Sequence, residues 1–400
     1  MAEISLTGIL VVAAVAFAVP LLLGLAPALR LPAVVLEIVA GVVIWPSVLG
    51  VVEVDVALRV LALIGLAFLL FLAGLEIDPE GLRGGQFGLA AAGFALSLAI
   101  AFGVGFALWA GGLVGAPVLV AIVLCATSLG IVVPVLADAG QTRGPLGQLV
   151  IAASSIADFG AIILLSLFFS RGSTGVGARL LLLGAFALLV IAAAAALAAA
   201  GRLKRLGAVL TRLQDTSAQI RVRGAFLLLV GFAVLAQPFG LEVILGAFLA
   251  GTILALLDRD RAMTHPRFRG KLEAVGYGVF IPFFFVTSGM ELDLGALFGG
   301  GGSALLIPVF LLALLLARGL PAWLYRARIG TRGAVAAGLL QATSLPFIVA
   351  AAEIGRELGA LDPATGAAFV VAGLLSVVLF PLLALTFLRA AGSPRARRAP

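Results

Sequence analysis

The sequence Ala126-Thr-Ser-Leu129 recurs as Ala342-Thr-Ser-Leu345, and helix-breaking residues follow each copy. Gly130 and Pro134 follow the first copy, and Pro346 follows the second. Proline removes a backbone donor and strains the preceding turn, whereas Thr and Ser hydroxyls can satisfy the freed backbone groups. The pattern therefore predicts two broken helices, whose loosened carbonyls and half-helix dipoles could coordinate an ion. A pair of ordinary proline kinks is the alternative.

A second pair of matching stretches indicates that the chain is internally duplicated. Gly74-Leu-Glu-Ile-Asp78 recurs as Gly289-Met-Glu-Leu-Asp293, an offset of 215 residues, and the Ala-Thr-Ser-Leu copies are offset by 216. Short matches can arise by chance in a biased composition. Two matches in the same order at nearly the same offset favour a duplication.

The composition is that of a membrane protein. Of the 400 residues, 63% are hydrophobic and 11% are charged, and the mean hydropathy is +1.25. Lipid is therefore the expected solvent. The lone Cys125 excludes an intramolecular disulfide and a cysteine-based metal motif, and the lone His265 lies among arginines as an expected solvated residue. The net charge of +7 comes from arginines between apolar runs, so we expect no nucleic-acid partner.

Apolar runs of roughly 17 to 25 residues, the length that crosses a bilayer, predict an all-α integral membrane protein with about thirteen transmembrane helices. They centre near residues 16, 41, 66, 98, 126, 159, 189, 231, 249, 282, 314, 343 and 376. With the N-terminus outside and the C-terminus cytoplasmic, twenty-one of the 26 basic residues fall on the cytoplasmic side. The positive-inside rule therefore favours this orientation, in a bacterial inner (plasma) membrane.

The repeat and the predicted spans together suggest the domain organisation. Corresponding spans are seven apart, an odd number, so the two copies must face opposite ways across the bilayer as inverted-topology repeats. We expect a first transmembrane helix over 1–30, retained because it lacks the basic n-region of a signal peptide. The other expected parts are a first inverted repeat (31–200), a cytoplasmic linker helix (201–223), a second inverted repeat (224–390) and a basic cytoplasmic tail (391–400).

Asp158 is the strongest candidate for a functional residue. It lies in the middle of the sixth predicted span, with no charged neighbour within a dozen residues. An unpaired carboxylate at that depth costs several kcal/mol, so it indicates a function. Burial favours its protonated form and a nearby cation favours its ionised form, which lets a proton and a metal cation such as Na⁺ compete for one site. Neutral oxygens from Thr127, Ser128, Ser154 and Ser155 complete the predicted transient ion site.

Arg318 is the only basic residue deep inside a predicted span. Because arginine stays protonated, it must be paired or hydrogen-bonded when buried, and we interpret it as a fixed counter-charge near the broken helices. The alternative is an arginine that snorkels to the interface. Thr343 and Ser344 of the second break are predicted to be structural partners of the site. Glu242, which follows a Pro-Phe-Gly break, is either a second ion or structural ligand or a solvated residue.

Several stretches together resemble the monovalent cation:proton antiporter-2 family, with its bacterial sodium/proton exchangers and potassium-efflux proteins. The resemblance covers about residues 5–390. Its motifs are Glu37-Ile-Val-Ala-Gly41 with Pro46, Phe71-Leu-Ala-Gly-Leu-Glu76, Ala126-Thr-Ser128, Gly246-Ala-Phe-Leu-Ala-Gly251 and Pro282-Phe-Phe-Phe-Val-Thr-Ser-Gly289.

The resemblance implies a dimerisation domain and a six-helix core that holds crossed broken helices and an essential aspartate matching Asp158. It also implies a homodimer that moves the core in an elevator-like step. In the sodium exchangers Asp or Asn precedes that aspartate, and in the potassium-efflux branch Gln does. Ala157 stands there in this chain, which leaves ion identity and stoichiometry open. Arg318 looks like the family's buried basic residue, which favours the electroneutral type.

The expected function is therefore antiport of a monovalent cation, Na⁺ before K⁺ or Li⁺, against protons by alternating access. Sodium is favoured because no long nucleotide-binding segment follows the last predicted span. Two alternatives stay open: a K⁺/H⁺ antiporter of the potassium-efflux type and a sodium-coupled symporter of an organic anion. No span combines a nucleophile, a base and an orienting group, so we expect neither an enzyme nor a cofactor.

Overall fold

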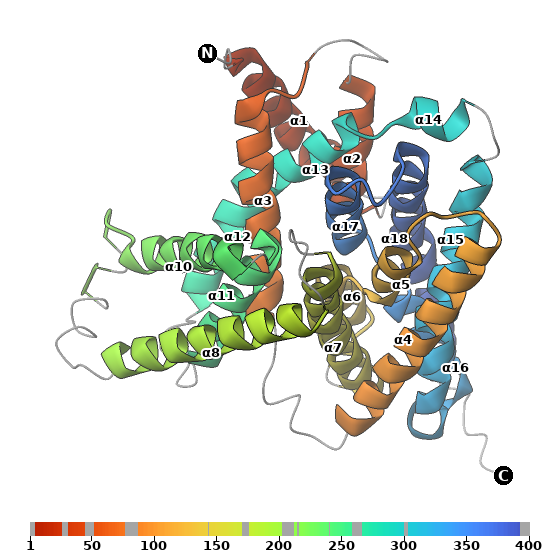
Figure 1. The fold of residues 1–400 in the computed structure, drawn as a ribbon. Helices are drawn as coiled ribbons and strands as arrows, with labels where there is room; N and C mark the ends of the chain where they lie inside the picture. Colours follow the sequence, from red (N-terminus) through yellow and green to blue (C-terminus); the bar gives the residue numbers. More distant parts are fainter. Residues whose placement is uncertain are drawn as a thin grey trace. The chain divides into compact units, whose positions relative to one another are not determined.

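Helices make up the regular structure of the residues that the computed structural model describes (Figure 1). These residues are 5–25, 31–44, 52–76, 87–142, 144–169, 176–201, 212–213, 216–239, 241–257, 266–299 and 303–392. Most of the predicted linker over 201–223 lies outside them, as do His265, Asp78 and residues 393–400 of the predicted tail.

The chain forms two compact units, each built from two separate segments. Unit 1 comprises residues 1–78 and 166–291, and unit 2 comprises 79–165 and 292–400. The helices of unit 1 are α1 (Leu6–Leu25), α2 (Ala33–Ile44), α3 (Val56–Leu75), α8 (Val176–Gly201), α10 (Ile220–Ala236), η2 (Gln237–Phe239), α11 (Val243–Leu257), α12 (Pro266–Val275), the π-helical η3 (Gly276–Phe280) and α13 (Ile281–Met290).

Unit 2 contains the helices around the two predicted breaks. They are α4 (Phe87–Ala110), α5 (Pro117–Cys125), α6 (Leu129–Asp138), α7 (Pro145–Phe168), whose last residues are grouped with unit 1, α14 (Leu294–Phe298), η4 (Ser303–Leu305), α15 (Leu306–Leu314), the π-helical η5 (Leu315–Gly319), η6 (Leu320–Tyr325), α16 (Arg326–Gln341), α17 (Pro346–Glu357) and α18 (Pro363–Gly392). The breaks between α5 and α6 and between α16 and α17 fall at the two Ala-Thr-Ser-Leu copies, as predicted.

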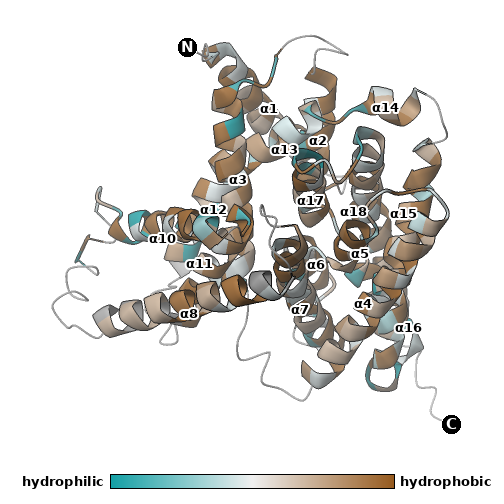
Figure 2. Ribbon diagram, viewed as in Figure 1, coloured by the Kyte–Doolittle hydropathy of each residue, from teal (hydrophilic) through white to brown (hydrophobic). Residues whose placement is uncertain are grey.

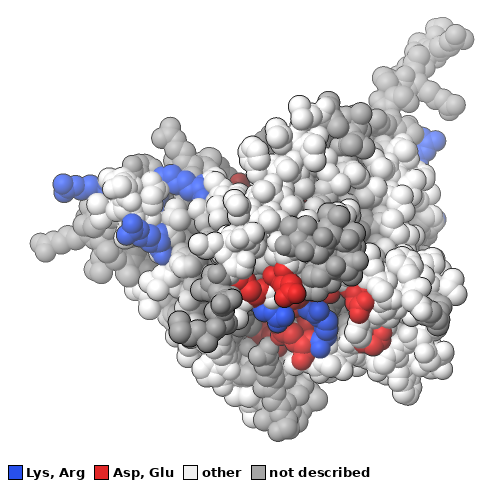
Figure 3. Space-filling model, turned by 90° about the horizontal axis from the view of Figure 1, so that it is seen from above, with Lys and Arg blue, Asp and Glu red and all other residues white. Residues whose placement is uncertain are grey.

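The helices have the length and composition of membrane spans. Eight helical stretches in the described part are long and apolar enough to cross a bilayer, and shorter apolar helices accompany them. Hydrophobic residues run along most helices in Figure 2, and most of the described surface in Figure 3 carries no charged side chain. The chain is thus an all-α, multi-pass membrane protein, and the count of thirteen spans remains a prediction.

Glycines allow two pairs of helices in unit 1 to pack with their backbones in contact. A Cβ atom on Gly41 of α2 would overlap the carbonyl oxygen of Val286 in α13, and one on Gly289 of α13 would overlap that of Ile38 in α2. Small residues permit such close approach between membrane helices. Gly41 and Gly289 belong to the stretches that carry the family resemblance, so these stretches mark helix crossings in unit 1.

Replacing Gly251 with alanine should destabilise the second such crossing. Gly251 of α11 faces the carbonyl oxygen of Phe71 in α3, and Gly74 of α3 faces that of Phe248 in α11. Overpacking of this kind costs about 1–3 kcal/mol, so we expect Gly251→Ala to lower the melting temperature in detergent. The control is Gly231→Ala, because Gly231 is exposed on α10 and a Cβ there meets no atom within 4 Å. Equal melting temperatures for the two variants would contradict the packing argument.

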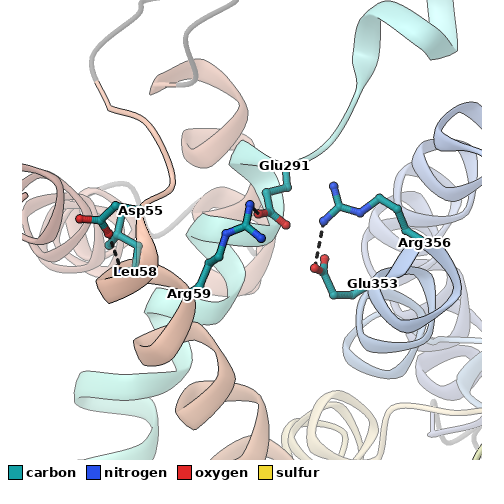
Figure 4. A network of polar contacts seen from close by, with 6 residues as sticks. All are labelled: Asp55, Leu58, Arg59, Glu291, Glu353 and Arg356. Atoms are coloured by element: carbon teal, nitrogen blue, oxygen red, sulfur yellow. Dashed lines mark hydrogen bonds and ion pairs between the residues drawn. The ribbon is translucent and has the colours of Figure 1, made fainter. Parts of the chain in front are cut away.

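Polar side chains fix the ends of these helices. Asp55 caps α3 by accepting hydrogen bonds from the backbone N–H groups of Leu58 and Ser5, both at 2.8 Å. Arg59 on the first turn of α3 reaches Glu291 after α13, with 3.5 Å between Nη2 and Oε1 (Figure 4). In unit 2, Figure 4 shows Arg356 bonded to Glu353 one turn earlier on α17, at 2.9 Å. The arginine of each ion pair is exposed, so these pairs contribute little to stability.

Glu76, the residue after α3, makes stability dependent on pH. Burial raises the pKa of Glu76 from 4.5 to about 7, Arg269 at 3.7 Å lowers it and Glu273 raises it. A raised carboxyl pKa stabilises the fold at acidic pH, and that contribution is lost as pH rises through about 7. Glu76→Gln should therefore melt at higher temperature than wild type at about pH 8, with the advantage gone near pH 5. Thermal melts of both proteins across this pH range test the prediction. The control is Glu357→Gln, which removes one acid at an exposed position. A difference in melting temperature between Glu76→Gln and wild type that does not change with pH would contradict the prediction.

Candidate functional site

The two helix breaks of unit 2 are joined to each other by hydrogen bonds. The backbone N–H of Ser128 donates to the carbonyl oxygen of Thr343 at 2.9 Å. The Thr127 hydroxyl donates to the carbonyl oxygen of Gln341 at 2.8 Å. Buried backbone groups in a bilayer must find partners inside the protein, and each break supplies partners for the other. The crossing is therefore a single structural feature built from both halves of the chain.

Asp158 lies on α7 beside this crossing. Its Oδ1 accepts a hydrogen bond from the backbone N–H of Thr127 at 3.1 Å. Its side chain is neither fully buried nor fully exposed, whereas Ala157 before it is completely buried. The N-terminal end of α6 follows the first break, and such a helix end stabilises a negative charge. The carboxylate is thus held at the break while part of its surface stays exposed.

Arg318 is buried in the same site, with 1% of its surface exposed. Its Nε donates to the Thr127 hydroxyl at 2.9 Å, its Nη1 donates to the Ser97 hydroxyl at 3.1 Å and its Nη2 reaches the carbonyl oxygen of Ala153 at 3.4 Å. Arg318 belongs to the π-helical η5, a local distortion that often marks functional positions. The structure therefore buries this arginine beside the broken helices, with its guanidinium bonded inside the protein.

Thr127 connects the two charged side chains of the site. Its N–H binds Asp158, while its hydroxyl accepts from Arg318 and donates to the second break. Arg318 and Asp158 also interact electrostatically. A fixed positive charge and one carboxylate therefore share a site with a backbone crossing, which is an arrangement suited to exchanging a bound proton for a bound cation.

The hydroxyl groups predicted to line the site differ in their availability. Ser154, one helical turn before Asp158 on α7, is fully buried and its Oγ has no hydrogen-bond partner within the described part of the chain. The Ser155 hydroxyl is bonded to the carbonyl oxygen of Ile151 at 2.9 Å. Because neighbours three and four apart share a helix face, Ser154 offers an unbonded hydroxyl on the Asp158 face of α7.

The second break contains the other predicted residues of the site. The Thr343 hydroxyl donates to the carbonyl oxygen of Leu339 at 3.1 Å, while the Thr343 carbonyl accepts from the first break. Ser344 is completely buried, and its backbone N–H donates to the Ser376 hydroxyl of α18 at 3.2 Å. Glu242, in contrast, belongs to unit 1, directly before α11, and has a partner of its own.

Three residues of the site were missed from the sequence. Ser97 on α4 accepts from Arg318, Gln341 supplies a carbonyl oxygen to Thr127, and Ser376 binds the second break. Gln341 directly precedes the repeated Ala-Thr-Ser-Leu motif, so its position offered a signal. Among the described residues no group of three or more His, Cys, Asp or Glu side chains could hold a metal ion. Binding at this site would therefore rest on one carboxylate and neutral oxygens.

Paired helix breaks at a buried charged site in a multi-pass helical protein define a secondary transporter. The chain belongs to the sodium/hydrogen exchanger family, whose transmembrane region matches residues 13–387. Members of this family are antiporters and not enzymes, in agreement with the sequence-based prediction.

Individual relatives support the same class. A Bacillus subtilis protein named "Putative Na(+)/H(+) antiporter YjbQ" is 32% identical over 96% of this chain. The glutathione-regulated potassium-efflux system protein KefC of Klebsiella pneumoniae is 29% identical, also over 96%. The chain spans 63% and 61% of the lengths of these two relatives. The structure of the sodium proton antiporter MjNhaP1 from Methanocaldococcus jannaschii has the same fold, with a TM-score of 0.68 and 17% identity over 96% of this chain and 98% of that one.

Proposed function

We propose that this protein exchanges a monovalent cation for protons across the membrane, and that Asp158 binds each of them in turn. The observation that carries the proposal is the Asp158 carboxylate bonded to the first helix break, with the buried Arg318 attached to the same threonine. A proton and a cation cannot both satisfy one carboxylate, so binding of one displaces the other. Alternating exposure of the site to the two sides would couple their movements.

Charge counting favours electroneutral exchange. Arginine keeps its positive charge at all physiological pH values, so Arg318 contributes a constant charge throughout the cycle. Asp158 is the one carboxylate found at the crossing among the described residues. If the Asp158 site crosses the membrane in one direction with a bound proton and in the other with one bound monovalent cation, the site carries the same charge in both directions. The exchange ratio would then be one cation for one proton.

Sodium is the first expected cation, and potassium is the alternative. Na⁺ is a hard ion suited to carboxylate, carbonyl and hydroxyl oxygens, and Asp158, Ser154 and the carbonyls of the breaks offer such oxygens. The alternative, that K⁺ is the transported cation, rests on the KefC relative, whose name describes potassium efflux. Ala157 supplies no polar ligand beside Asp158 and favours neither ion. A sodium-coupled organic anion symporter is less favoured, because the crossing offers few further polar side chains for an organic substrate.

We further propose the setting in which this exchange takes place. The distribution of basic residues supports an N-terminus outside and a cytoplasmic C-terminus in a bacterial inner membrane. The long α1 supports homodimer formation, because many of its large apolar side chains are exposed, among them Leu6, Leu10 and Phe17. Lipid or a second copy of the chain would cover them. Unit 2, which contains the whole crossing, would be the moving core.

Transport by the purified protein in liposomes tests the proposal. A proton-sensitive dye inside the vesicles should report proton movement when Na⁺, Li⁺ or K⁺ is added outside, and the order of the three responses identifies the cation. Clamping the membrane voltage should leave the rate unchanged for a one-to-one exchange. Proton movement that needs no cation, or cation uptake that moves no protons, would reject antiport.

A further inference from the structure

A serine on α18 holds the second helix break much as Asp158 holds the first. The Ser376 hydroxyl accepts from the backbone N–H of Ser344 at 3.2 Å and lies 3.0 Å from the carbonyl oxygen of the same residue and 2.8 Å from that of Gly373. Ser376 and Ser344 both have 0% of their surface exposed. The hydroxyl therefore accepts from the N–H of a residue that the helix break has left without its regular helical partner, and its single proton faces two carbonyl oxygens, those of Ser344 and Gly373.

Gly373, one turn earlier on the same face of α18, allows this contact to form. A Cβ atom on Gly373 would lie 3.1 Å from the Ser344 carbonyl oxygen and 3.2 Å from a terminal carbon of Ile348. Contacts this short require the neighbouring atoms to move. Gly373 and Ser376 together therefore form a small platform on α18 against which the broken segment rests.

The platform occupies a position in the second half of the chain close to that of Asp158 in the first. Asp158 binds the N–H of Thr127, and Ser376 binds the N–H of Ser344. The offsets are 344 − 127 = 217 and 376 − 158 = 218, within three of the repeat offsets of 215 and 216. The direct sequence counterpart of Asp158 is the apolar Leu374, so the equivalent contact comes from a residue two positions later and is made by a neutral group.

We propose that Ser376 is a positioning residue for cation binding, which fixes the second break so that its oxygens face the ion at the crossing. The inference rests on the proposed function of the crossing. The Thr343 carbonyl and the Gln341 carbonyl, both of which contact the first break, precede Ser344 by one and three residues. Movement of Ser344 would displace them. Because Ser376 carries no charge, it can tune the fit of the cation without taking part in the proton exchange at Asp158.

Ser376→Ala tests the proposal in the liposome assay. It leaves the N–H and carbonyl of Ser344 without the serine hydroxyl in an apolar environment, so we expect the apparent KM for the cation to rise about tenfold, the equivalent of about 1.4 kcal/mol. The maximal rate and the pH profile at saturating cation should stay within about threefold of wild type, since Asp158 is unchanged. Ser376→Thr keeps the hydroxyl and should restore the KM.

Two further variants keep the test decisive. Gly373→Ala pushes on the Ser344 carbonyl without removing any hydroxyl, and it should also raise the KM. It decides the question if Ser376→Ala fails to fold. Ser166→Ala is the matched control, because Ser166 on α7 is a fully buried serine whose Oγ has no partner among the described residues. Its KM should equal that of wild type.

An unchanged KM in Ser376→Ala overturns the positioning role. If Ser376→Ala does not fold, an unchanged KM in Gly373→Ala overturns it. A fall in maximal rate with unchanged KM also overturns it, because it indicates a purely structural serine. Asp158→Asn measured in parallel separates this inference from the proposed function. If Asp158→Asn is inactive and Ser376→Ala is normal, only the role of Ser376 is rejected. If Asp158→Asn transports normally, the proposed ion site itself is rejected.

Discussion

We expect Asp158→Asn to abolish cation-driven proton movement in liposomes while the protein still folds and inserts. Asparagine has nearly the same size and shape, and its side-chain oxygen can still accept the hydrogen bond from the N–H of Thr127. The backbone of the first break therefore keeps its partner. The amide can neither release a proton near neutral pH nor offer a negative charge to a cation. We expect a loss of at least a hundredfold in the exchange rate, with a small change in melting temperature.

The control variant for Asp158→Asn is Asp362→Asn. Asp362 is an exposed residue of unit 2 that caps α18, with Oδ1 accepting from the N–H of Thr365 at 2.9 Å. Asparagine is an equally good helix cap, so this variant changes one acid to an amide in the same unit without touching the crossing. It should exchange at the wild-type rate. Residual exchange in Asp158→Asn above the level of empty liposomes would require a second proton carrier.

The sequence predicted the parts of the site that break a local rule. A carboxylate or an arginine inside an apolar run is costly, so Asp158 and Arg318 stood out without any structural information. Proline and glycine after a repeated Thr-Ser pair likewise signalled the breaks, and both breaks lie where they were expected. Pairing within the site could not be predicted, because it depends on which helices are neighbours.

The residues that were missed follow ordinary helix patterns. Ser97 and Ser376 are small polar residues in long apolar helices, where a serine commonly bonds to its own backbone, so nothing in the sequence separates them from Ser166. Their roles appear only when α4 and α18 are packed beside Arg318 and Ser344. The glycines of the resemblance motifs are a related case. Gly41 and Gly251 were part of a family signature, but only the packing of α2 on α13 and of α3 on α11 explains why a side chain does not fit there.

Arg318→Met should reduce the exchange rate by more than about tenfold and lower the melting temperature, because three partners lose their donors at once. The Thr127 and Ser97 hydroxyls and the Ala153 carbonyl are reached by three different nitrogens of one planar group. Removal of one member of a buried charged set is strongly destabilising, at about 3–5 kcal/mol. Arg318→Lys keeps the charge but presents a compact ammonium that cannot reproduce this fork. We expect it to recover part of the stability and little of the rate.

The double variant Asp158→Asn with Arg318→Met shows whether the two charges balance each other. If they do, Asp158→Asn should destabilise the protein less in the Arg318→Met background than in wild type, because the carboxylate there has lost its counter-charge. Arg328→Met, at an exposed position of α16, controls for the loss of a positive charge. Additive melting temperatures would show that Arg318 acts through its hydrogen bonds and does not balance the charge of Asp158.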